Sequence, residues 1–288
     1  NSNLLKAVDI VLHFIFLLVF IQLVVYHNAY NFRLLYGSTS SGQASALYNL
    51  DLYFWGIEDK NMFGARIAML GFPYIMMPLI RFGKFSWWRT CWIFLLAYMS
   101  LSRTPIVALL IGVFFLLWFF SGIKWRLIVV VVMGVTLPFI LQKIIRVENL
   151  TASNDGMGVR LVYWKAFFQN FTEISPLGNG FMSAPLFLAE HAEFYRGEPH
   201  IHNTFLTCYL ELGIIGLISY CLFLFYFFME CKQKLMSNKF WVVAFLPLLS
   251  IMMILYSGYD NDIVIYLTMI YLLGSLKIID FKNIRMGL

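Results

Sequence analysis

The sequence His200-Ile201-His202-Asn203-Thr204-Phe205-Leu206 marks the point where a long polar interval ends and an apolar run begins. The polar interval starts at Arg146, in a chain whose other long segments are mostly apolar. Asn203, at the boundary itself, is a residue type that often starts a helix as its N-cap. We therefore interpret residues 146–203 as an extracytoplasmic loop above a bundle of membrane helices, and residues 1–288 as one membrane domain.

The composition is that of an integral membrane protein. Of the 288 residues, 61% are apolar and 12% are charged, well outside the averages of soluble proteins. The net charge of +6 does not indicate nucleic-acid binding, because the basic residues lie in short clusters between apolar runs. The four cysteines show no CxxC spacing, so neither a zinc site nor a disulfide framework is predicted.

About eight apolar runs could each cross a hydrocarbon core of roughly 30 Å as a helix. They are residues 4–25, 63–80, 87–101, 106–120, 127–145, 205–228, 240–256 and 263–276. The sequence thus predicts an all-α membrane protein with about eight transmembrane helices. Pro138 predicts a kink in the fifth helix. Because the chain starts at Asn1 without a signal-peptide pattern, we also expect a truncated amino terminus.

The basic clusters set the orientation, because Lys and Arg beside membrane spans are retained in the cytoplasm. Basic residues crowd the short connections at residues 81–89, 124–126 and 232–239. Those connections are therefore predicted to be cytoplasmic, as are both chain ends. Arg103 and the loop 146–203 then share the opposite, extracytoplasmic face.

Within the loop, residues 159–171 are predicted to form a short amphipathic helix. The members of its stripe, at near-helical spacing, are Arg160, Trp164, Phe167, Phe168 and Phe171. A helix rich in aromatic residues, but too short and polar to span a membrane, is expected to lie in the outer interface. The sequence Ser175-Pro176-Leu177-Gly178-Asn179-Gly180 then ends it.

Two arginines are candidates for binding a phosphate. Arg103 stands in a tight turn between two apolar runs, and Arg160 lies near the start of the aromatic helix. A planar guanidinium can grip a phosphate with two hydrogen bonds, whereas lysine offers a point charge. Either arginine could instead reach anionic lipid head groups, so from the residues alone both interpretations stay open.

His200 and His202 are candidates for a general base, because a neutral imidazole accepts a proton near neutral pH. Two residues apart, they share a face only on an extended segment. A metal pair is disfavoured, since no further ligand follows at the usual spacing. Without a family to guide the choice, solvated loop histidines are the default. Neither a metal nor a cofactor is expected.

Glu211 follows about two helical turns after Asn203, inside the next apolar run. A carboxylate there is costly unless it is paired or functional. Gly213 and Gly216 come next and favour close helix packing. No P-loop, GxGxxG or GxSxG motif is present, so a nucleotide-driven enzyme or a serine hydrolase lacks support.

Taken together, five motifs resemble the O-antigen ligase and O-antigen polymerase superfamily of bacterial inner membranes. In chain order they are Ser102-Arg103-Thr104, Gly158-Val159-Arg160 with Trp164, Pro176-Leu177-Gly178-Asn179-Gly180, His202-Asn203-Thr204-Phe205-Leu206, and Glu211 with Gly213 and Gly216. The resemblance covers about residues 94–273 and does not separate ligase from polymerase. Members usually have more spans, so either helices are missing from the amino end or this is a short member.

The resemblance implies a GT-C-like glycosyltransferase with a large periplasmic loop. It would transfer a glycan from an undecaprenyl-pyrophosphate carrier to an acceptor glycan or lipid A core, without a metal or a nucleotide sugar. By the same resemblance, Arg103 and Arg160 hold the pyrophosphate. His202, with His200 as the rival, activates the acceptor hydroxyl. The residues implied to support them are Asn203, Glu211 and Trp164.

A transporter or flippase of a lipid-linked saccharide is the alternative from a different functional class. In such a protein the two arginines would bind the phosphate without any bond being broken. Transporters tend to carry polar residues at the membrane midplane and internal repeats, and neither is clear in this sequence. The enzyme is therefore preferred, with its active site facing the periplasm or the exterior.

Overall fold

The structure is a computed structural model that describes residues 2–36, 60–139, 156–234, 238–255 and 260–275. These residues form helices and turns and contain no β-strand, so the all-helical prediction is confirmed for this part of the chain. The chain forms two compact units. That both belong to one membrane domain stays a prediction.

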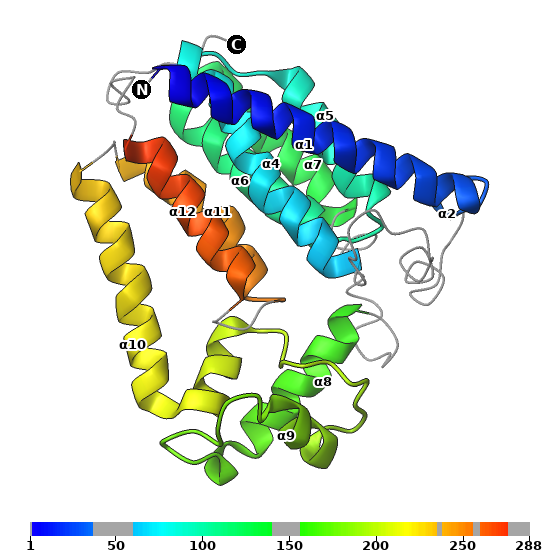
Figure 1. The fold of residues 1–288 in the computed structure, drawn as a ribbon, viewed down its shortest axis with the longest axis vertical. Helices are drawn as coiled ribbons and strands as arrows, with labels where there is room; N and C mark the ends of the chain where they lie inside the picture. The colour runs from blue at the N-terminus through cyan, green and yellow to red at the C-terminus, as the bar shows by residue number, and fades with distance from the viewer. Residues whose placement is uncertain (1, 37–59, 140–155, 235–237, 256–259, 276–288) are drawn as a thin grey trace. The chain divides into compact units, whose positions relative to one another are not determined.

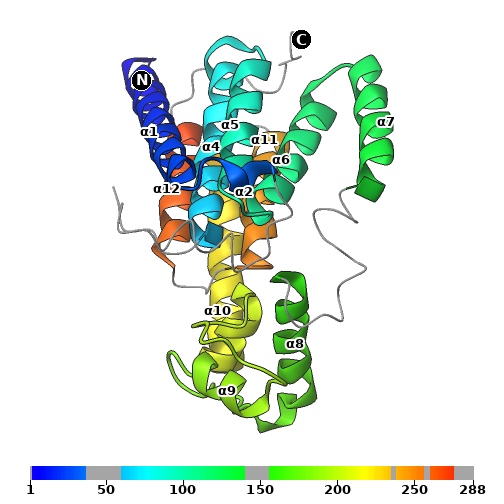
Figure 2. The same ribbon diagram turned by 90° about the vertical axis from the view of Figure 1, so that its right-hand side faces the viewer.

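The first unit consists of Asn1–Thr136, Cys231–Leu248 and Ile265–Leu288. Its helices are α1 (Ser2–Ala29), α2 (Arg33–Tyr36), α4 (Lys60–Phe82), α5 (Trp87–Met99), α6 (Thr104–Phe120), most of α7 (Ile123–Phe139), and parts of α11 (Asn238–Met252) and α12 (Asn261–Ser275). The helix α4 packs against α1, α5 and α6 (Figure 1; Figure 2). It is apolar and buried around most of its circumference, as a central helix of a bundle must be.

The turn that carries Arg103 packs closely on α4. A Cβ atom at Gly64 would lie 2.8 Å from Ser102 Cβ and 2.9 Å from Pro105 Cγ, so glycine is needed for this approach. Pro105 lies in the first turn of α6, as predicted, where its missing N–H costs no hydrogen bond. Arg103 precedes the helix at the N-cap position and is partly buried.

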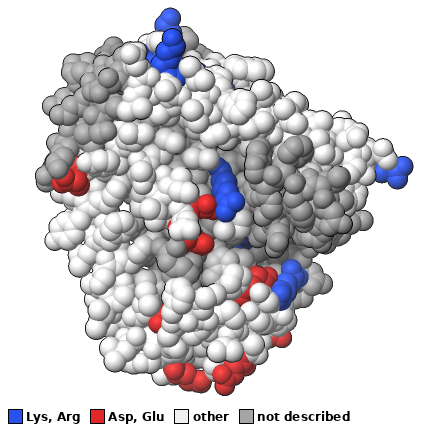
Figure 3. Space-filling model, in the orientation of Figure 1, with Lys and Arg blue, Asp and Glu red and all other residues white. Residues whose placement is uncertain are grey.

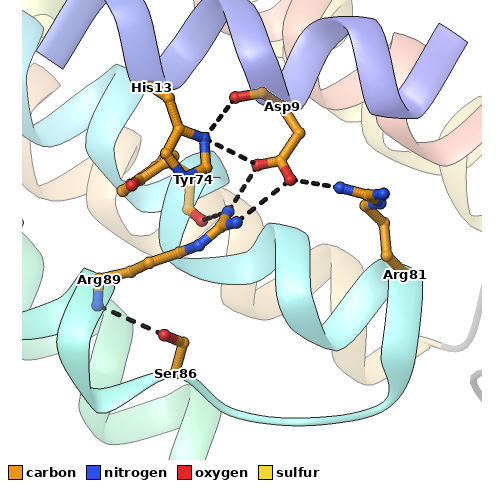
Figure 4. Close-up of polar contacts among 6 residues, drawn as sticks. All are labelled: Asp9, His13, Tyr74, Arg81, Ser86 and Arg89. Atoms are coloured by element: carbon orange, nitrogen blue, oxygen red, sulfur yellow. Dashed lines mark hydrogen bonds and ion pairs between the residues drawn. The ribbon is translucent and has the colours of Figure 1, made fainter. Parts of the chain in front are cut away.

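A buried carboxylate ties three helices of the first unit together (Figure 4). Asp9 of α1 is 3% exposed and forms ion pairs with Arg81 of α4 and Arg89 of α5, the latter at 2.6 Å. The guanidinium of Arg89 also lies over the ring of Tyr74, with Cζ 4.5 Å from the ring centroid. A buried charge is tolerated when it is paired in this way, so the cluster fixes α1, α4 and α5 to one another.

The second unit consists of Leu137–Glu230 and Leu249–Val264. It contains α8 (Gly156–Gln169), a 3-10 turn η3 (Phe171–Glu173), α9 (Ala184–His191) and most of α10 (Thr204–Lys234). Its core consists of Val159, Tyr163, Phe167, Ile174, Ala184, Phe187, Leu188, Ile201 and Leu210. The described part of the predicted loop, residues 156–203, is therefore folded around an apolar core of its own.

The stripe predicted for residues 159–171 is partly wrong. Phe168 and Phe171 are 63% and 44% exposed, whereas Tyr163, outside that stripe, is fully buried. The buried face of α8 follows Val159, Tyr163 and Phe167 at a spacing of four residues, and the α-helix ends before Phe171. This face packs into the unit's own core, and the position of the helix in the membrane interface stays a prediction.

A helix is present at each of the eight apolar runs, but not all of these helices are long enough to span a membrane. By length and composition, three described helices could cross one: Asn3–Ala29, Lys60–Phe82 and Thr204–Cys231. Thr104–Phe120, Phe240–Met252 and Asn261–Leu273 are apolar but shorter. The helices support an integral membrane protein, and the number of eight spans stays a prediction.

Some boundaries differ from those predicted or fall outside the described residues. The helix α7 begins earlier than its predicted run and contains Pro138, but residues 140–145 of that run lie outside the description. The first helix extends to Ala29, and residues 37–59 of the following polar stretch are likewise outside it. The side of the membrane on which each connection lies stays a prediction.

Candidate active site

The end of α11 brings three predicted site residues together. Three consecutive backbone carbonyls, at residues 253–255, each accept a hydrogen bond from one of these side chains. In order, the donors are Asn203, Arg160 and His202. The last carbonyls of a helix have no partner within that helix, and side chains from α8 and from the segment before α10 fill the gap here.

Arg160 is held on two sides by backbone carbonyls. Its Nε donates to the carbonyl of Ile254 at 2.7 Å, and its Nη1 donates to the carbonyl of Gly156 at 3.1 Å. The side chain lies near the amino end of α8, as predicted, and the residue is 9% exposed. The guanidinium is thus fixed in position rather than extended at the surface.

His200 and His202 lie side by side on the non-helical segment before α10. Their ring centroids are 4.8 Å apart, and the residues are 8% and 9% exposed. The default interpretation of solvated loop histidines is therefore wrong. His202 has a φ angle of 58°, in the left-handed region that side chains other than glycine seldom adopt, so its backbone is strained where its ring enters the site.

Tyr163 supports His202 and was not among the predicted site residues. The two rings are parallel, with an interplanar angle of 3° and centroids 6.0 Å apart. The buried hydroxyl of Tyr163 donates to the carboxylate of Glu198 and accepts from the Arg196 N–H at 3.2 Å. Tyr163 follows Arg160 by one helical turn, which is the sequence signal that could have identified it.

The pKa of His202 lies well below the usual histidine value. Burial is the largest cause, followed by the charges of His200 and Arg160, and the hydrogen bond to Leu255 opposes them. Nδ1 of His202 has no hydrogen-bond partner among the residues that the structure describes, so the bond to the Leu255 carbonyl comes from Nε2. The ring is therefore neutral near pH 7, with an accepting lone pair on Nδ1.

Asn203 starts α10 as its N-cap, as predicted. Its Oδ1 accepts from the N–H groups of Phe205 at 3.0 Å and Leu206 at 3.1 Å. Its Nδ2 donates to the Met253 carbonyl at 3.2 Å. One side chain therefore fixes both the first turn of α10 and its position beside the end of α11.

A pair of glycines, Gly178 and Gly213, joins the loop to α10, and we call the pair the glycine clamp. At Gly213 the helix is interrupted, with φ 68° and ψ −166°. A Cβ atom there would lie 2.2 Å from the Pro176 carbonyl oxygen, and one at Gly178 would lie 2.4 Å from the Glu211 carbonyl oxygen. The predicted close approach is confirmed, but the partner is a loop and not a second helix.

Backbone hydrogen bonds complete the clamp. The N–H of Asn179 donates to the Leu210 carbonyl at 2.8 Å, and that of Gly180 donates to the Glu211 carbonyl at 3.1 Å. The break at Gly213 frees these carbonyls from the helix, and the loop takes the place of the missing helical donors. The Glu211 side chain beside them is 2% exposed.

Two further predicted residues, Trp164 and Arg103, belong to different units. Trp164 packs against the core of the second unit, and its buried Nε1 has no hydrogen-bond partner within the described residues. Arg103 belongs to the first unit. Its meeting with Arg160 at one pyrophosphate stays a prediction.

Comparison with known proteins gives one family. The model of the family described as O-antigen ligase matches residues 89–221, a stretch that contains Arg103, Arg160 and His202. A search of curated proteins finds no match to the chain. The resemblance predicted from the motifs is confirmed at the level of the superfamily.

Proposed function

Residues 89–221 form a domain of the O-antigen ligase family, and from this premise we propose that the protein transfers a glycan from a polyprenyl-pyrophosphate carrier to an acceptor hydroxyl. The family and the apolar helices support a membrane transferase of polysaccharide biosynthesis. Our proposal adds the carrier, an acceptor glycan or lipid A core, a metal-independent reaction, and an active site on the periplasmic face of the bacterial inner membrane.

The observation that carries the proposal is the row of carbonyls at residues 253–255. These carbonyls hold the guanidinium of Arg160 and the neutral imidazole of His202 close together. A glycosyl transfer from a pyrophosphate needs both kinds of group, a cation for the leaving group and a base for the acceptor. A protein that only binds a lipid-linked sugar needs the cation alone, so the imidazole favours the enzyme.

In the proposed reaction, the bond between the anomeric carbon and the pyrophosphate oxygen breaks, and its electron pair stays on the pyrophosphate. The acceptor hydroxyl oxygen bonds to the anomeric carbon from the opposite side, with inversion. The imidazole of His202 takes the hydroxyl proton. Because negative charge grows on the leaving group as the bond breaks, Arg160 stabilises the transition state more than the ground state.

The depressed pKa of His202 suits a base that acts after the donor has bound. The charge of Arg160 is one cause of the depression. A pyrophosphate beside Arg160 would offset that charge, and its own negative charge would favour the protonated ring. The imidazole would therefore become a stronger base once the donor is in place.

Arg103 is assigned the second contact with the pyrophosphate. It stands at the N-cap position of α6, where the free N–H groups of the first helical turn favour an anion. Glu211 and Trp164 are assigned supporting roles. Glu211 adjoins the glycine clamp through its carbonyl, and Trp164 lies on α8, four residues after Arg160.

The test is a reconstituted assay with undecaprenyl-pyrophosphate-linked oligosaccharide in vesicles. We expect the release of undecaprenyl pyrophosphate together with glycan on the acceptor. Longer carrier-linked chains would identify a polymerase, and glycan on lipid A core would identify a ligase. Exchange of the saccharide between leaflets without cleavage would contradict the enzyme and support the flippase.

Histidine variants sharpen the assay. His202→Ala should lower transfer by about 100-fold to 10,000-fold, the range for loss of a general base. His200→Ala should have a smaller effect, since His202 provides the accepting nitrogen. His191→Ala, which alters a histidine of α9 in the same unit, is the matched control. If His200→Ala caused the larger loss, the roles of the two neighbouring histidines would be exchanged.

A further inference from the structure

An uncharged segment interrupts the polar loop. Residues 174–189 include no Asp, Glu, Lys, Arg or His. Four large apolar side chains in this segment are exposed: Leu177 at 73%, Phe181 at 64%, Met182 at 53% and Leu186 at 76%. A single exposed apolar residue needs no explanation, but a group of four in a short segment indicates a contact with an apolar partner.

The position of this segment is fixed by the glycine clamp, which holds it against α10 at the point where that helix is interrupted. Leu177 lies between two clamp contacts, since the Pro176 carbonyl accepts from the Ile214 N–H at 2.9 Å and Gly178 touches the Glu211 backbone. Phe181 directly follows Gly180, whose N–H is bonded to α10. The backbone that carries Leu177 and Phe181 is therefore fixed beside residues 210–214 of α10.

The environment of α10 changes at the same point. None of residues 204–211 is exposed. Beyond Gly213, large apolar side chains are exposed, among them Ile215 at 63% and Phe225 at 55%. Residues 214–231 span about 27 Å at roughly 1.5 Å per residue, close to the hydrocarbon thickness of about 30 Å. The helix thus enters the lipid at the kink.

We propose that residues 174–189 lie at the lipid boundary beside the kink, with Leu177, Phe181, Met182 and Leu186 inserted among the acyl chains. The clamp joins this segment to α10 at the start of the exposed apolar part of that helix, since the Ile214 N–H is bonded to the Pro176 carbonyl. The absence of charge removes the main cost of such insertion. Elsewhere on this unit Glu190 and Glu193 are exposed, and the face seen in Figure 3 is mostly uncharged, with separate groups of acidic and basic side chains.

The partner is a lipid surface, and the inference does not depend on the transfer reaction. It adds a second interfacial segment to the predicted interfacial helix 159–171, whose Phe168 and Phe171 are also exposed. Insertion would also keep the second unit at a constant depth in the membrane. That depth is where a lipid-linked substrate has its pyrophosphate.

Site-specific labelling tests this position. In a variant without the four native cysteines, Leu177→Cys or Phe181→Cys would carry the environment-sensitive fluorophore NBD. The protein would be placed in vesicles of phosphatidylethanolamine and phosphatidylglycerol. Glu193→Cys, an exposed position in the same unit, is the matched control. We expect nitroxide-labelled lipids to quench positions 177 and 181 several-fold more than position 193, and aqueous iodide to quench in the reverse order.

Two results would overturn the proposal. Equal iodide quenching at all three positions would place the segment in water. Protection of positions 177 and 181 from both quenchers would mean that protein, from another copy or another part of the chain, covers them. Both readouts are independent of activity, so they stand apart from any failure of the proposed transfer reaction.

Discussion

The Asp9 cluster and the site around Arg160 both bury an arginine, but they treat its charge differently. Arg89 is bound by the carboxylate of Asp9 at 2.6 Å, so a negative charge cancels a positive one. Arg160 donates to the backbone carbonyls of Ile254 and Gly156, and these hydrogen bonds orient the guanidinium beside His202. The first arrangement suits a tie between helices, and the second suits the orientation of a side chain in the proposed site.

The largest expected effect separates the two arginines by function. Arg160→Ala should lower glycan transfer by about 100-fold to 1,000-fold, the typical loss for one donor that stabilises a developing anion. Arg89→Ala should leave the transfer rate of the folded protein nearly unchanged and lower its resistance to denaturation. Transfer assays and unfolding curves on both variants would check this. Equal losses of transfer in Arg160→Ala and Arg89→Ala would contradict this separation of roles.

The Asp9 cluster should respond as a structural ion pair. Asp9→Asn should destabilise the protein by about 3 kcal/mol or less, because it leaves two partly buried arginines without their carboxylate. Replacing Asp9, Arg81 and Arg89 together by apolar residues should recover most of that loss. Denaturant titration in detergent micelles measures both. A triple variant that recovers stability but loses transfer would assign the cluster to the site.

A smaller effect is expected at Tyr163, which acts through His202. Tyr163→Phe keeps the parallel ring and removes the hydrogen bond to Glu198, so the transfer rate should fall by about tenfold, as for other residues that orient a catalytic group. Tyr195→Phe, which removes a neighbouring hydroxyl bonded to the Glu198 carbonyl, is the control. A kcat as low as that of His202→Ala would make Tyr163 a direct participant.

The smallest effect is a shift in one pKa. Arg160 lowers the pKa of His202, so Arg160→Gln should raise that pKa. Lys165→Gln, on the same helix, should leave the pKa of His202 unchanged. Titration of histidine-labelled protein by NMR measures both. A pKa that does not move in Arg160→Gln would mean that the two side chains lie too far apart to share a substrate.

The same pKa predicts how stability depends on pH. His202 is buried and its pKa is lowered, so below the ordinary histidine pKa of about 6.5 the unfolded chain binds more protons than the folded one. The contribution of His202 to stability is therefore complete above about pH 6.5 and is lost as the pH falls below it. In His202→Ala, unfolding curves should show a weaker dependence on pH in this range.

Local features of the site were predictable from the sequence. Asn203 was expected to cap α10, and the cap is present because its oxygen lies within reach of N–H groups two and three residues later. Pro105 was expected in a first helical turn for an equally local reason. Such contacts join neighbours in the chain, so the pattern of residues is sufficient to indicate them.

Contacts over long distances in the chain were not predictable in the same way. Without the family resemblance the histidines were expected in solvent, because nothing in residues 200–203 shows that the ring of Tyr163 and the carbonyls of residues 253–255 will cover them. The partner of Gly213 was expected to be a helix, and it is a loop. Glycine indicates that a backbone will approach closely, but it does not indicate which backbone.

The sequence by itself determined the all-helical class, the membrane character and the resemblance to the O-antigen ligase superfamily, because apolar periodicity, composition and motif order need no knowledge of contacts. The tertiary structure decided how deeply the two histidines are buried, what holds Arg160, and which part of the loop faces outward. These properties depend on burial and on hydrogen bonds between segments up to 94 residues apart, which only the packed chain brings together.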